Sequence, residues 1–187
     1  MPESTPILDR GSDRAHAPLR IIIPLVRDVA VSVFLAVLVI IFLYQPVKVE
    51  GTSMMPALAD QERVFVNKVI YRFGEIERGD TVVFWYPPDT SKSYIKRVVG
   101  LPGDEVRISD GAVYVNGKLL AEAYVEAAYR SRESMSAGIV PKDHYFVLGD
   151  HRSSSNDSRA WGPVHRRYIY GKAVFVYWPL ERMGPVR

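Results

Sequence analysis

A fully apolar strand pattern with clear boundaries occurs at Gly79-Asp80-Thr81-Val82-Val83-Phe84-Trp85-Tyr86-Pro87-Pro88. Residues 81–86 are β-branched or aromatic throughout, which is the composition typical of strands. A Gly-Asp pair precedes them and two prolines, which cannot continue a strand ladder, follow them. A short apolar run between such boundaries predicts a β-strand.

Outward from this stretch, the chain continues as short strands separated by turn residues. Residues 109–111 and Asn116-Gly117 are predicted turns, and the second pair is a strong signal for a type I′ hairpin turn. Residues 121–140 show no firm period, and we expect them to form a loop. The pattern predicts one mainly β domain over residues 46–187, which is long enough to form a core. The further predicted strands are residues 63–69, 93–99, 106–108, 112–115, 118–120, 145–148 and 172–178.

An apolar run of 16 residues, 29–44, precedes this domain and is interrupted only by Ser32. No polar stripe follows the helical period, so no face is reserved for water. As a helix the run spans about 24 Å, less than the roughly 30 Å hydrocarbon core of a bilayer. Arg27 and Lys48 lie at its ends and can snorkel to close the gap. Pro24 and the Arg27-Asp28 pair set the run apart from the apolar residues before it.

Two other interpretations of this run are a buried core helix and a cleaved signal peptide. A core helix so uniformly apolar is unusual in a small domain, and Tyr44-Gln45-Pro46-Val47 contains no small-residue cleavage site. We therefore expect a cytoplasmic tail over residues 1–28, of which residues 1–20 are mobile, and a transmembrane anchor over residues 29–45. More basic residues precede the anchor than follow it, which predicts a cytoplasmic N-terminus and an extracytoplasmic domain in the cell membrane.

Composition excludes several classes of function. The net charge is only +3 and is spread along the chain, which does not favour nucleic-acid binding. The chain has no cysteine, so disulfides, thiolate catalysis and Cys-based zinc sites are excluded. We expect no metal and no organic cofactor.

One serine, Ser53, lies between Gly51 and the Met54-Met55-Pro56 sequence, nine residues after Tyr44. Most serines in such a place are turn residues. A serine nucleophile needs a neighbouring base, because its hydroxyl is too weakly acidic to attack an amide unaided. Three histidines, His144, His151 and His165, are candidate bases in the β domain, although no strand-to-helix nucleophile elbow accompanies them.

The other candidate base is Lys96, which interrupts the apolar strand 93–99 and shares one face with Tyr94 and Val98. A free lysine has a pKa of about 10.4 and is a poor base at neutral pH, but burial lowers that value. The alternative is an edge-strand lysine whose ammonium reaches water and discourages aggregation. Arg97 faces the other side of the strand and is the weaker candidate.

Four sequence motifs, which follow one another along the chain, resemble those of a known family. They are Gly51-x-Ser53-Met54-x-Pro56-x-Leu58, Gly79-Asp80-x-Val82-Val83-Phe84, the run 94–104 that begins Tyr94-Ile95-Lys96-Arg97, and Gly149-Asp150-x-Arg152-x-Ser154-Ser155-x-Asp157-Ser158-Arg159. With the N-terminal anchor, they resemble the bacterial type I signal peptidases (leader peptidases) in a short, single-anchor form. The resemblance covers residues 25–180, and its lysine and Gly-Asp motifs are long and specific.

The resemblance implies a role for each matching residue. Ser53 would be the nucleophile and Lys96 the general base of a Ser-Lys dyad, while Ser155 would hydrogen-bond the lysine and orient it. Asp157 and Arg159 would form an ion pair that supports the site. Five positions match the pockets for small substrate side chains, and these pockets would select Ala-x-Ala before the cut: Val49, Met54, Leu58, Tyr94 and Ile95.

The same resemblance implies a fold and a set of partners. The fold would be an antiparallel β-sheet protease core with a small inserted cap, which we place at about residues 104–142. The substrates would be preproteins bearing signal peptides. Membrane lipid and the secretion translocase would be further partners.

Two departures from the family pattern concern the site. Some members carry a serine at the position of Gly51 that helps to form the oxyanion hole. Here the hole would rest on backbone N–H groups, that of Ser53 above all, with Gly51 as a further candidate. The aspartate common after Gly-Asp-x-Arg is Ser153 in this chain.

Two other functions compete with a signal peptidase. The first is an inactive, membrane-anchored β domain that binds secretion partners, which the intact Ser53, Lys96 and Ser155 disfavour. The second is the self-cleaving repressor type, which also uses a Ser-Lys dyad. The anchor and the lack of upstream DNA-binding helices disfavour it.

Overall fold

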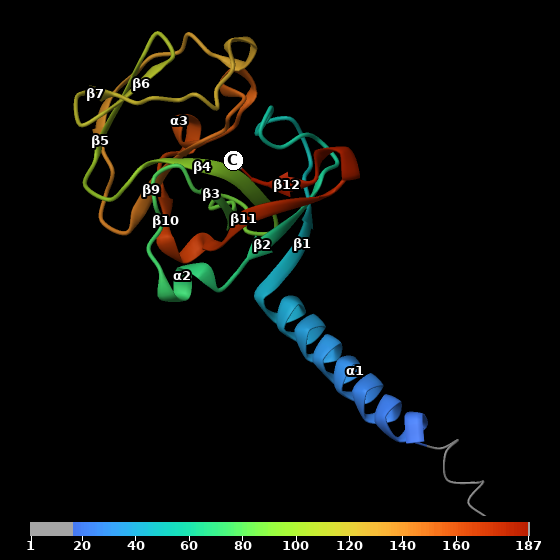
Figure 1. Cartoon of the computed structure of the whole chain (residues 1–187). Coiled ribbons are helices and arrows are strands. Elements are labelled where there is room, and N and C mark those ends of the chain that lie inside the picture. The colour runs from blue at the N-terminus through green and yellow to red at the C-terminus, as the bar shows by residue number, and fades with distance from the viewer. Residues whose placement is uncertain (1–16, 187) are drawn as a thin grey trace, which may run out of the picture. The chain divides into compact units, whose positions relative to one another are not determined.

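The computed structural model describes residues 17–186, which form two units that divide between Phe42 and Leu43. The first unit is α1 (Ala17–Leu43) except for its last residue, which belongs to the second. Every strand lies in the second unit, Leu43–Arg187 (Figure 1). Of the tail predicted over residues 1–28, residues 1–16 lie outside the described part.

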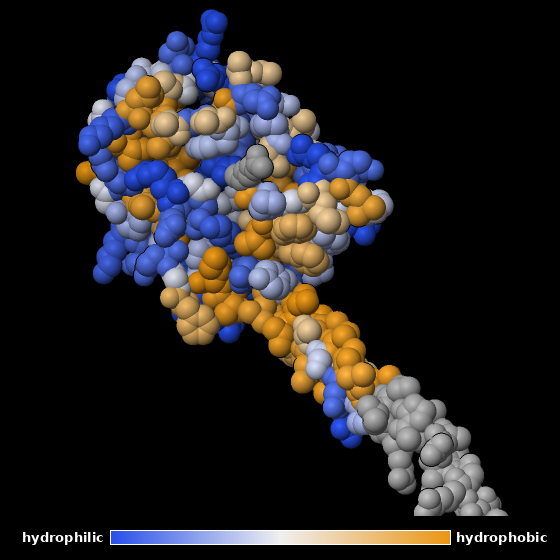
Figure 2. Space-filling model, viewed as in Figure 1, coloured by the Kyte–Doolittle hydropathy of each residue, from blue (hydrophilic) through white to orange (hydrophobic). Residues whose placement is uncertain are grey.

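The helix α1 begins earlier than the apolar run predicted. It continues through Pro24 and the Arg27-Asp28 pair, and its stretch Ile23–Leu43 is apolar and long enough to cross a membrane. These 21 residues span about 31 Å, so the shortfall expected from residues 29–44 disappears. Figure 2 shows mostly apolar side chains on the described part of the helix, interrupted by a small hydrophilic group. A helix satisfies its backbone hydrogen bonds within itself, which lets it include the polar pair.

The second unit is built from two antiparallel sheets. The larger has eight strands in the order β1-β2-β11-β3-β4-β9-β10, with β12 paired to β11, and the smaller has the order β7-β6-β5-β8. The elements are β1 (Tyr44–Lys48), β2 (Arg63–Asn67), α2 (Ile70–Phe73), β3 (Thr81–Trp85), β4 (Ser93–Gly100), β5 (Glu105–Ser109), β6 (Ala112–Val115), β7 (Lys118–Leu119), β8 (Met135–Ile139), β9 (His144–Leu148), α3 (Ser158–Trp161), β10 (Val164–His165), β11 (Ile169–Trp178) and β12 (Gly184–Pro185).

This architecture confirms a mainly antiparallel β fold. The opening stretch forms β3, whose first four residues are buried between β4 and β11. The turn between β6 and β7 has positive φ at both Asn116 and Gly117, as a type I′ turn requires. The smaller sheet spans residues 105–139, and its Val106 and Val113 share a core cluster with Val99 and Phe146 of the larger sheet.

Two strands lie where the sequence predicted other structure. Tyr44 and Gln45, predicted as the end of the anchor, begin β1, which pairs with β2 over five residues. Residues 121–140, predicted as loop, contain β8, which pairs with β5. Four of the five β8 residues are exposed, so no apolar alternation marks the strand. Its partner lies some 30 residues away in sequence, and only the fold brings the two together.

Candidate active site

The candidate site is built on β4, where Lys96 lies opposite Val82 of β3. The strand runs in the interior of the larger sheet, between β3 and β9, and its last five residues are buried. Lys96 is therefore not an edge-strand lysine: its side chain is 4 % exposed. Its Nζ lies 2.7 Å from Ser53 Oγ and donates to the carbonyl of Ile95 at 3.0 Å.

Burial sets the basicity of this lysine. It lowers the pKa of Lys96 to about 8, against the charges of Asp157 and Asp150, which favour the ammonium form. The Tyr94 ring, 5.3 Å from Nζ, covers the amine on one side. A lysine with such a pKa is neutral in a substantial fraction of molecules near pH 8, and in that form it can accept a proton.

Ser53 lies in a tight turn after β1 that the core holds at both ends. Val49 exchanges backbone hydrogen bonds with residues 61 and 62, and Met54 and Leu58 are buried against the larger sheet. Gly51 has φ +90°, a conformation that glycine adopts without strain. Within the described part of the chain, the backbone N–H of Ser53 makes no hydrogen bond and remains free to donate.

A second loop, residues 149–159, packs against this turn. His151 N donates to the Ser53 carbonyl at 3.1 Å, and its Nδ1 lies 3.2 Å from the Thr52 carbonyl, which can only accept. A Cβ added at Gly149 would lie 2.4 Å from the Ser53 carbonyl oxygen and 2.2 Å from Ser155 Oγ. Only glycine therefore allows the two loops to approach this closely.

Asp157 and Arg159 form an ion pair that holds the second loop in shape. The carboxylate accepts from Arg159 Nε and Nη2, and also from Gly149 N at 3.0 Å. Burial alone would raise the pKa of Asp157, but the bonds and charge of Arg159 and the Gly149 N–H hold it below its usual value. Among the described residues, neither member of the pair hydrogen-bonds Ser53 or Lys96, and the pair fixes the backbone beside them.

Ser155 does not make the contact expected of it. Its hydroxyl is buried and completes no hydrogen bond within the described residues, so it does not bond Lys96 Nζ. Its proximity to Gly149 keeps it beside the Ser53 turn. A role in orienting the lysine stays a prediction.

A cleft of about 350 Å³ leads to the Ser-Lys pair. Four of the five predicted pocket residues line it, and the fifth, Leu58, is fully buried in the core beneath. The lining residues come from the end of β1, the Ser53 turn, β3, β4 and the second loop: Val47, Lys48, Val49, Glu50, Gly51, Thr52, Ser53, Met54, Val83, Ser93, Tyr94, Ile95, Lys96, Ser154 and Asn156.

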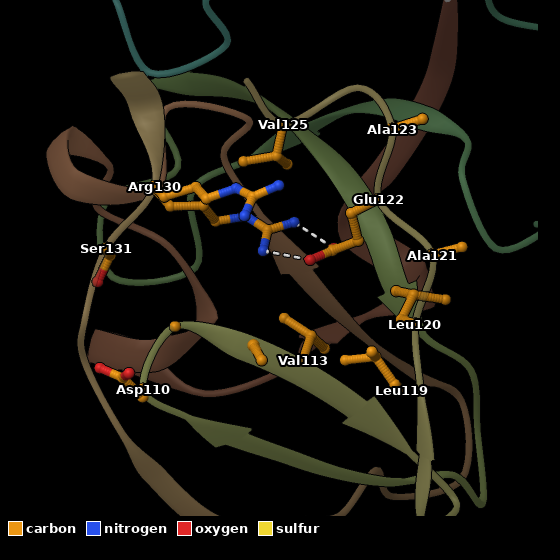
Figure 3. Close-up of a pocket in the computed structure, with 13 residues that line it drawn as sticks. Asp110, Val113, Leu119, Leu120, Ala121, Glu122, Ala123, Val125, Arg130 and Ser131 are labelled. Carbon is orange, nitrogen blue, oxygen red and sulfur yellow. Dashed lines mark hydrogen bonds and ion pairs between the residues drawn. The ribbon is translucent and has the colours of Figure 1, made fainter. Parts of the chain in front are cut away.

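Two buried ion pairs join this site to its surroundings. Arg97 Nε and Nη2 bind both carboxylate oxygens of Asp150, at 2.8 and 2.6 Å, next to Lys96 in sequence. Burial raises the pKa of Asp150, and Arg97 opposes that shift. Arg152 donates to the Gly149 carbonyl and pairs through its other two nitrogens with Glu122. Both residues line a second cavity of about 420 Å³ beside the smaller sheet (Figure 3).

The described histidines do not contact the serine hydroxyl. His144 and His165 are cross-strand partners on β9 and β10, with ring centroids 4.8 Å apart. The His151 ring bonds the Thr52 carbonyl and packs against the Tyr129 edge. Among the described residues, Lys96 is therefore the base that this geometry brings to Ser53.

Comparison with known proteins assigns the chain to a family. The family model described as signal peptidase, peptidase S26, matches residues 22–178. This chain belongs to the signal peptidase S26 family. Signal peptidase I T of Bacillus subtilis (strain 168) is 40 % identical over 167 residues, which cover 84 % of this chain and 86 % of the relative. A probable signal peptidase I-2 of Synechocystis is 41 % identical over 166 residues, which cover 84 % and 74 %. A signal peptidase I structure from Enterococcus faecalis V583 aligns with a TM-score of 0.48 at 32 % identity, covering 53 % of this chain and 97 % of that one.

Several contacts around the site cannot be predicted from the sequence. Glu122 lies in a stretch predicted as loop, and nothing local links it to Arg152, 30 residues later. The sequence offers His151 only as a candidate base, whereas in the structure its backbone and ring bond the Ser53 turn and tie two loops together. Arg97, the weaker candidate base, makes a buried ion pair instead. Each of these contacts joins distant segments and needs the fold to appear.

Proposed function

We propose that this protein is a membrane-anchored serine endopeptidase that removes signal peptides from exported preproteins, with Ser53 as nucleophile and Lys96 as general base. The observation that carries the proposal is the 2.7 Å separation between Ser53 Oγ and the Nζ of a buried lysine. Membership in the signal peptidase family supports the reaction class.

In the first step, neutral Lys96 takes the Ser53 proton while Oγ attacks the carbonyl carbon of the scissile bond. The tetrahedral intermediate collapses to an ester on Ser53, and Lys96 returns the proton to the leaving amine. Lys96 then activates a water molecule that hydrolyses the ester and releases the signal peptide. A pKa near 8 suits both directions of transfer, because the amine is neither always protonated nor always neutral.

The unpaired backbone N–H of Ser53 is the donor we assign to the oxyanion hole, with Gly51 beside it. A donor that is fixed before the reaction stabilises the developing charge without reorganisation. Gly51 N already donates to Asp60 at 2.7 Å, which leaves Ser53 N as the principal donor.

Val49, Met54 and Ile95 give the cleft an apolar wall beside the serine. The cleft is small and Leu58 fills the core behind it, so we infer that it accepts small side chains and selects Ala-x-Ala before the cut. Tyr94 closes the same wall next to Lys96.

The candidate span Ile23–Leu43 would anchor the protein in the cell membrane, with the N-terminus cytoplasmic and the β domain outside. Ser53 follows Leu43 by ten residues, so the connecting chain places it at most about 35 Å from the end of the span. Signal peptides, membrane lipid and the translocase would meet the enzyme there.

The test is cleavage of a purified precursor that carries an Ala-x-Ala site, by the full chain in detergent, with the new N-terminus identified by sequencing. We expect one cut directly after the second alanine. We expect none with Ser53→Ala, and none when the second alanine is replaced by a large residue. A folded wild-type protein that binds the precursor without cutting it would instead favour the inactive binding domain.

A further inference from the structure

A third cavity, of about 420 Å³, lies on the second unit and carries a concentration of positive charge. It shares Ser93 with the lining of the Ser53 cleft. Three cationic side chains line it, and no carboxylate does. Its lining consists of Gln45, Lys68, Tyr71, Arg72, Trp85, Ser93, Arg166, Ile169 and Tyr170. We propose that this cavity binds the phosphate of an anionic phospholipid headgroup.

The cations of the cavity are available for a ligand. Lys68 and Arg72 form no ion pair within the described residues. Arg166 is held in place by a bond to the Tyr71 carbonyl, but a guanidinium has five N–H groups and retains others to donate. Three positive charges without a counter-charge favour an anion, and a phosphate accepts several such bonds at once.

The acidic groups nearby are engaged or lie outside the cavity. Asp80 accepts from the Tyr71 hydroxyl at 2.8 Å and pairs with Lys172. Glu75 and Glu77 follow α2 in sequence but do not line the cavity. Within the described residues, no carboxylate therefore lines the cavity or forms an ion pair with one of its three cations.

The backbone places the cavity near Leu43, which is the last residue of the candidate span and belongs to the same unit as the cavity. Lys68 N donates to the carbonyl of Leu43, the last residue of α1, at 3.1 Å, and Gln45 of the lining is two residues further on. Figure 1 shows α2 at the same end of the β unit as the start of β1. If Leu43 leaves the bilayer, as the proposed anchoring requires, the cavity lies at the depth of the headgroups.

Aromatic residues beside the cavity suit the same position. Trp85 is 43 % exposed and packs against the Tyr170 ring at 4.8 Å, and both line the cavity. Phe73, next to Arg72 on α2, is 90 % exposed. Tryptophan and tyrosine concentrate at membrane interfaces, where one end of the side chain is apolar and the other wet. This surrounding favours a lipid over a free phosphate ion.

The experiment is native mass spectrometry of the full chain in detergent with an equimolar mixture of phosphatidylglycerol and phosphatidylcholine. The test variant is Lys68→Gln with Arg72→Gln. The matched control, Arg107→Gln with Lys118→Gln, removes two positive charges from the smaller sheet. Each basic residue near an anionic surface contributes about fivefold in affinity, so we expect the test variant to bind phosphatidylglycerol about 25-fold more weakly. The wild type and the control should retain a clear preference for it.

Three results would overturn the assignment: equal binding of the two lipids by the wild type, an equal loss in both double variants, or displacement of the lipid by inorganic phosphate at a similar concentration. Flotation with phosphatidylcholine vesicles reports the anchoring separately, and precursor cleavage in detergent reports the dyad. A failure of the proposed function would therefore be seen apart from a failure of the lipid site.

Discussion

At the level of single residues, Lys96 is the proposed general base, and burying its amine lowers the stability of the fold. A group whose folded pKa lies below its unfolded value disfavours folding wherever the unfolded chain is protonated. For Lys96 the pKa falls from 10.5 to about 8. Below pH 8 both states carry the proton and the cost is constant at about 3 kcal/mol, and it fades as the pH rises from 8 to 10.5.

Replacing Lys96 by methionine, which keeps an apolar stem of similar length, should therefore stabilise the fold by up to about 3 kcal/mol at neutral pH. The difference from wild type should shrink towards pH 10, because the wild-type amine is then already neutral in the folded state. Urea unfolding of both proteins at several pH values measures this. If the difference in unfolding free energy between the two proteins did not change with pH, the pKa of Lys96 would not be lowered by folding.

Gly149 is the second residue on which the site depends, because a Cβ there would collide with the Ser53 carbonyl. We expect Gly149→Ala to lower stability by about 1–3 kcal/mol and to reduce kcat by well over tenfold, since the serine turn must move. Gly138→Ala is the control, because a Cβ at Gly138 meets nothing within 4 Å. Similar kinetics for the two variants would contradict the packing described here.

At the scale of elements, the residues after β7 are tied to the loop beside the serine through Glu122 and Arg152. The Arg152 side chain is 4 % exposed, so losing its partner leaves a buried charge poorly compensated. We expect Glu122→Gln to lower the free energy of unfolding by about 2–3 kcal/mol.

Glu133→Gln is the matched control, because Glu133 is 67 % exposed and its partner Arg159 keeps Asp157. It should cost less than about 1 kcal/mol. Denaturant unfolding of both variants compares the two pairs, and an equal cost would mean that burial of Arg152 contributes nothing.

How far the sequence predicts the elements depends on whether their signals are local. Gly79-Asp80 and Pro87-Pro88 mark the two ends of β3, and Asn116-Gly117 specifies the turn between β6 and β7. Both the strand and the turn are therefore predicted from the sequence. The strand β8 is exposed and gains its partner only through the fold, and β1 continues directly from an apolar helix. Pro24 suggested a boundary, yet a helix in an apolar setting continues through it.

The site shows the same division. A lysine inside an apolar strand is visible in sequence, and so is the loop motif that contains Asp157 and Arg159. The separation of Ser53 and Lys96 by 43 residues, the bracing by His151 and the Glu122–Arg152 pair are properties of the assembled sheets. The cationic cavity likewise joins Lys68 and Arg72 to Arg166, nearly a hundred residues later.

At the scale of the whole molecule, all strands lie in the unit Leu43–Arg187, so removal of Met1–Phe42 should leave a folded β domain. We expect this shortened protein to cleave a soluble Ala-x-Ala peptide at a rate within a few-fold of the full chain. It should be much slower on precursors embedded in vesicles, because the anchor raises the effective concentration of enzyme at the bilayer. Rates measured on both substrates decide this, and equal efficiency on embedded precursors would contradict a role for the anchor.

The measurement that tests the central claim most directly is the rate of precursor cleavage by Lys96→Met, compared with His151→Ala and with wild type. If Lys96 is the base, Lys96→Met should be folded and inactive, with kcat reduced by at least about a thousandfold. His151→Ala should retain substantial activity, because the histidine holds a loop and transfers no proton. Near-normal turnover by folded Lys96→Met, with an inactive His151→Ala, would contradict the Ser-Lys dyad.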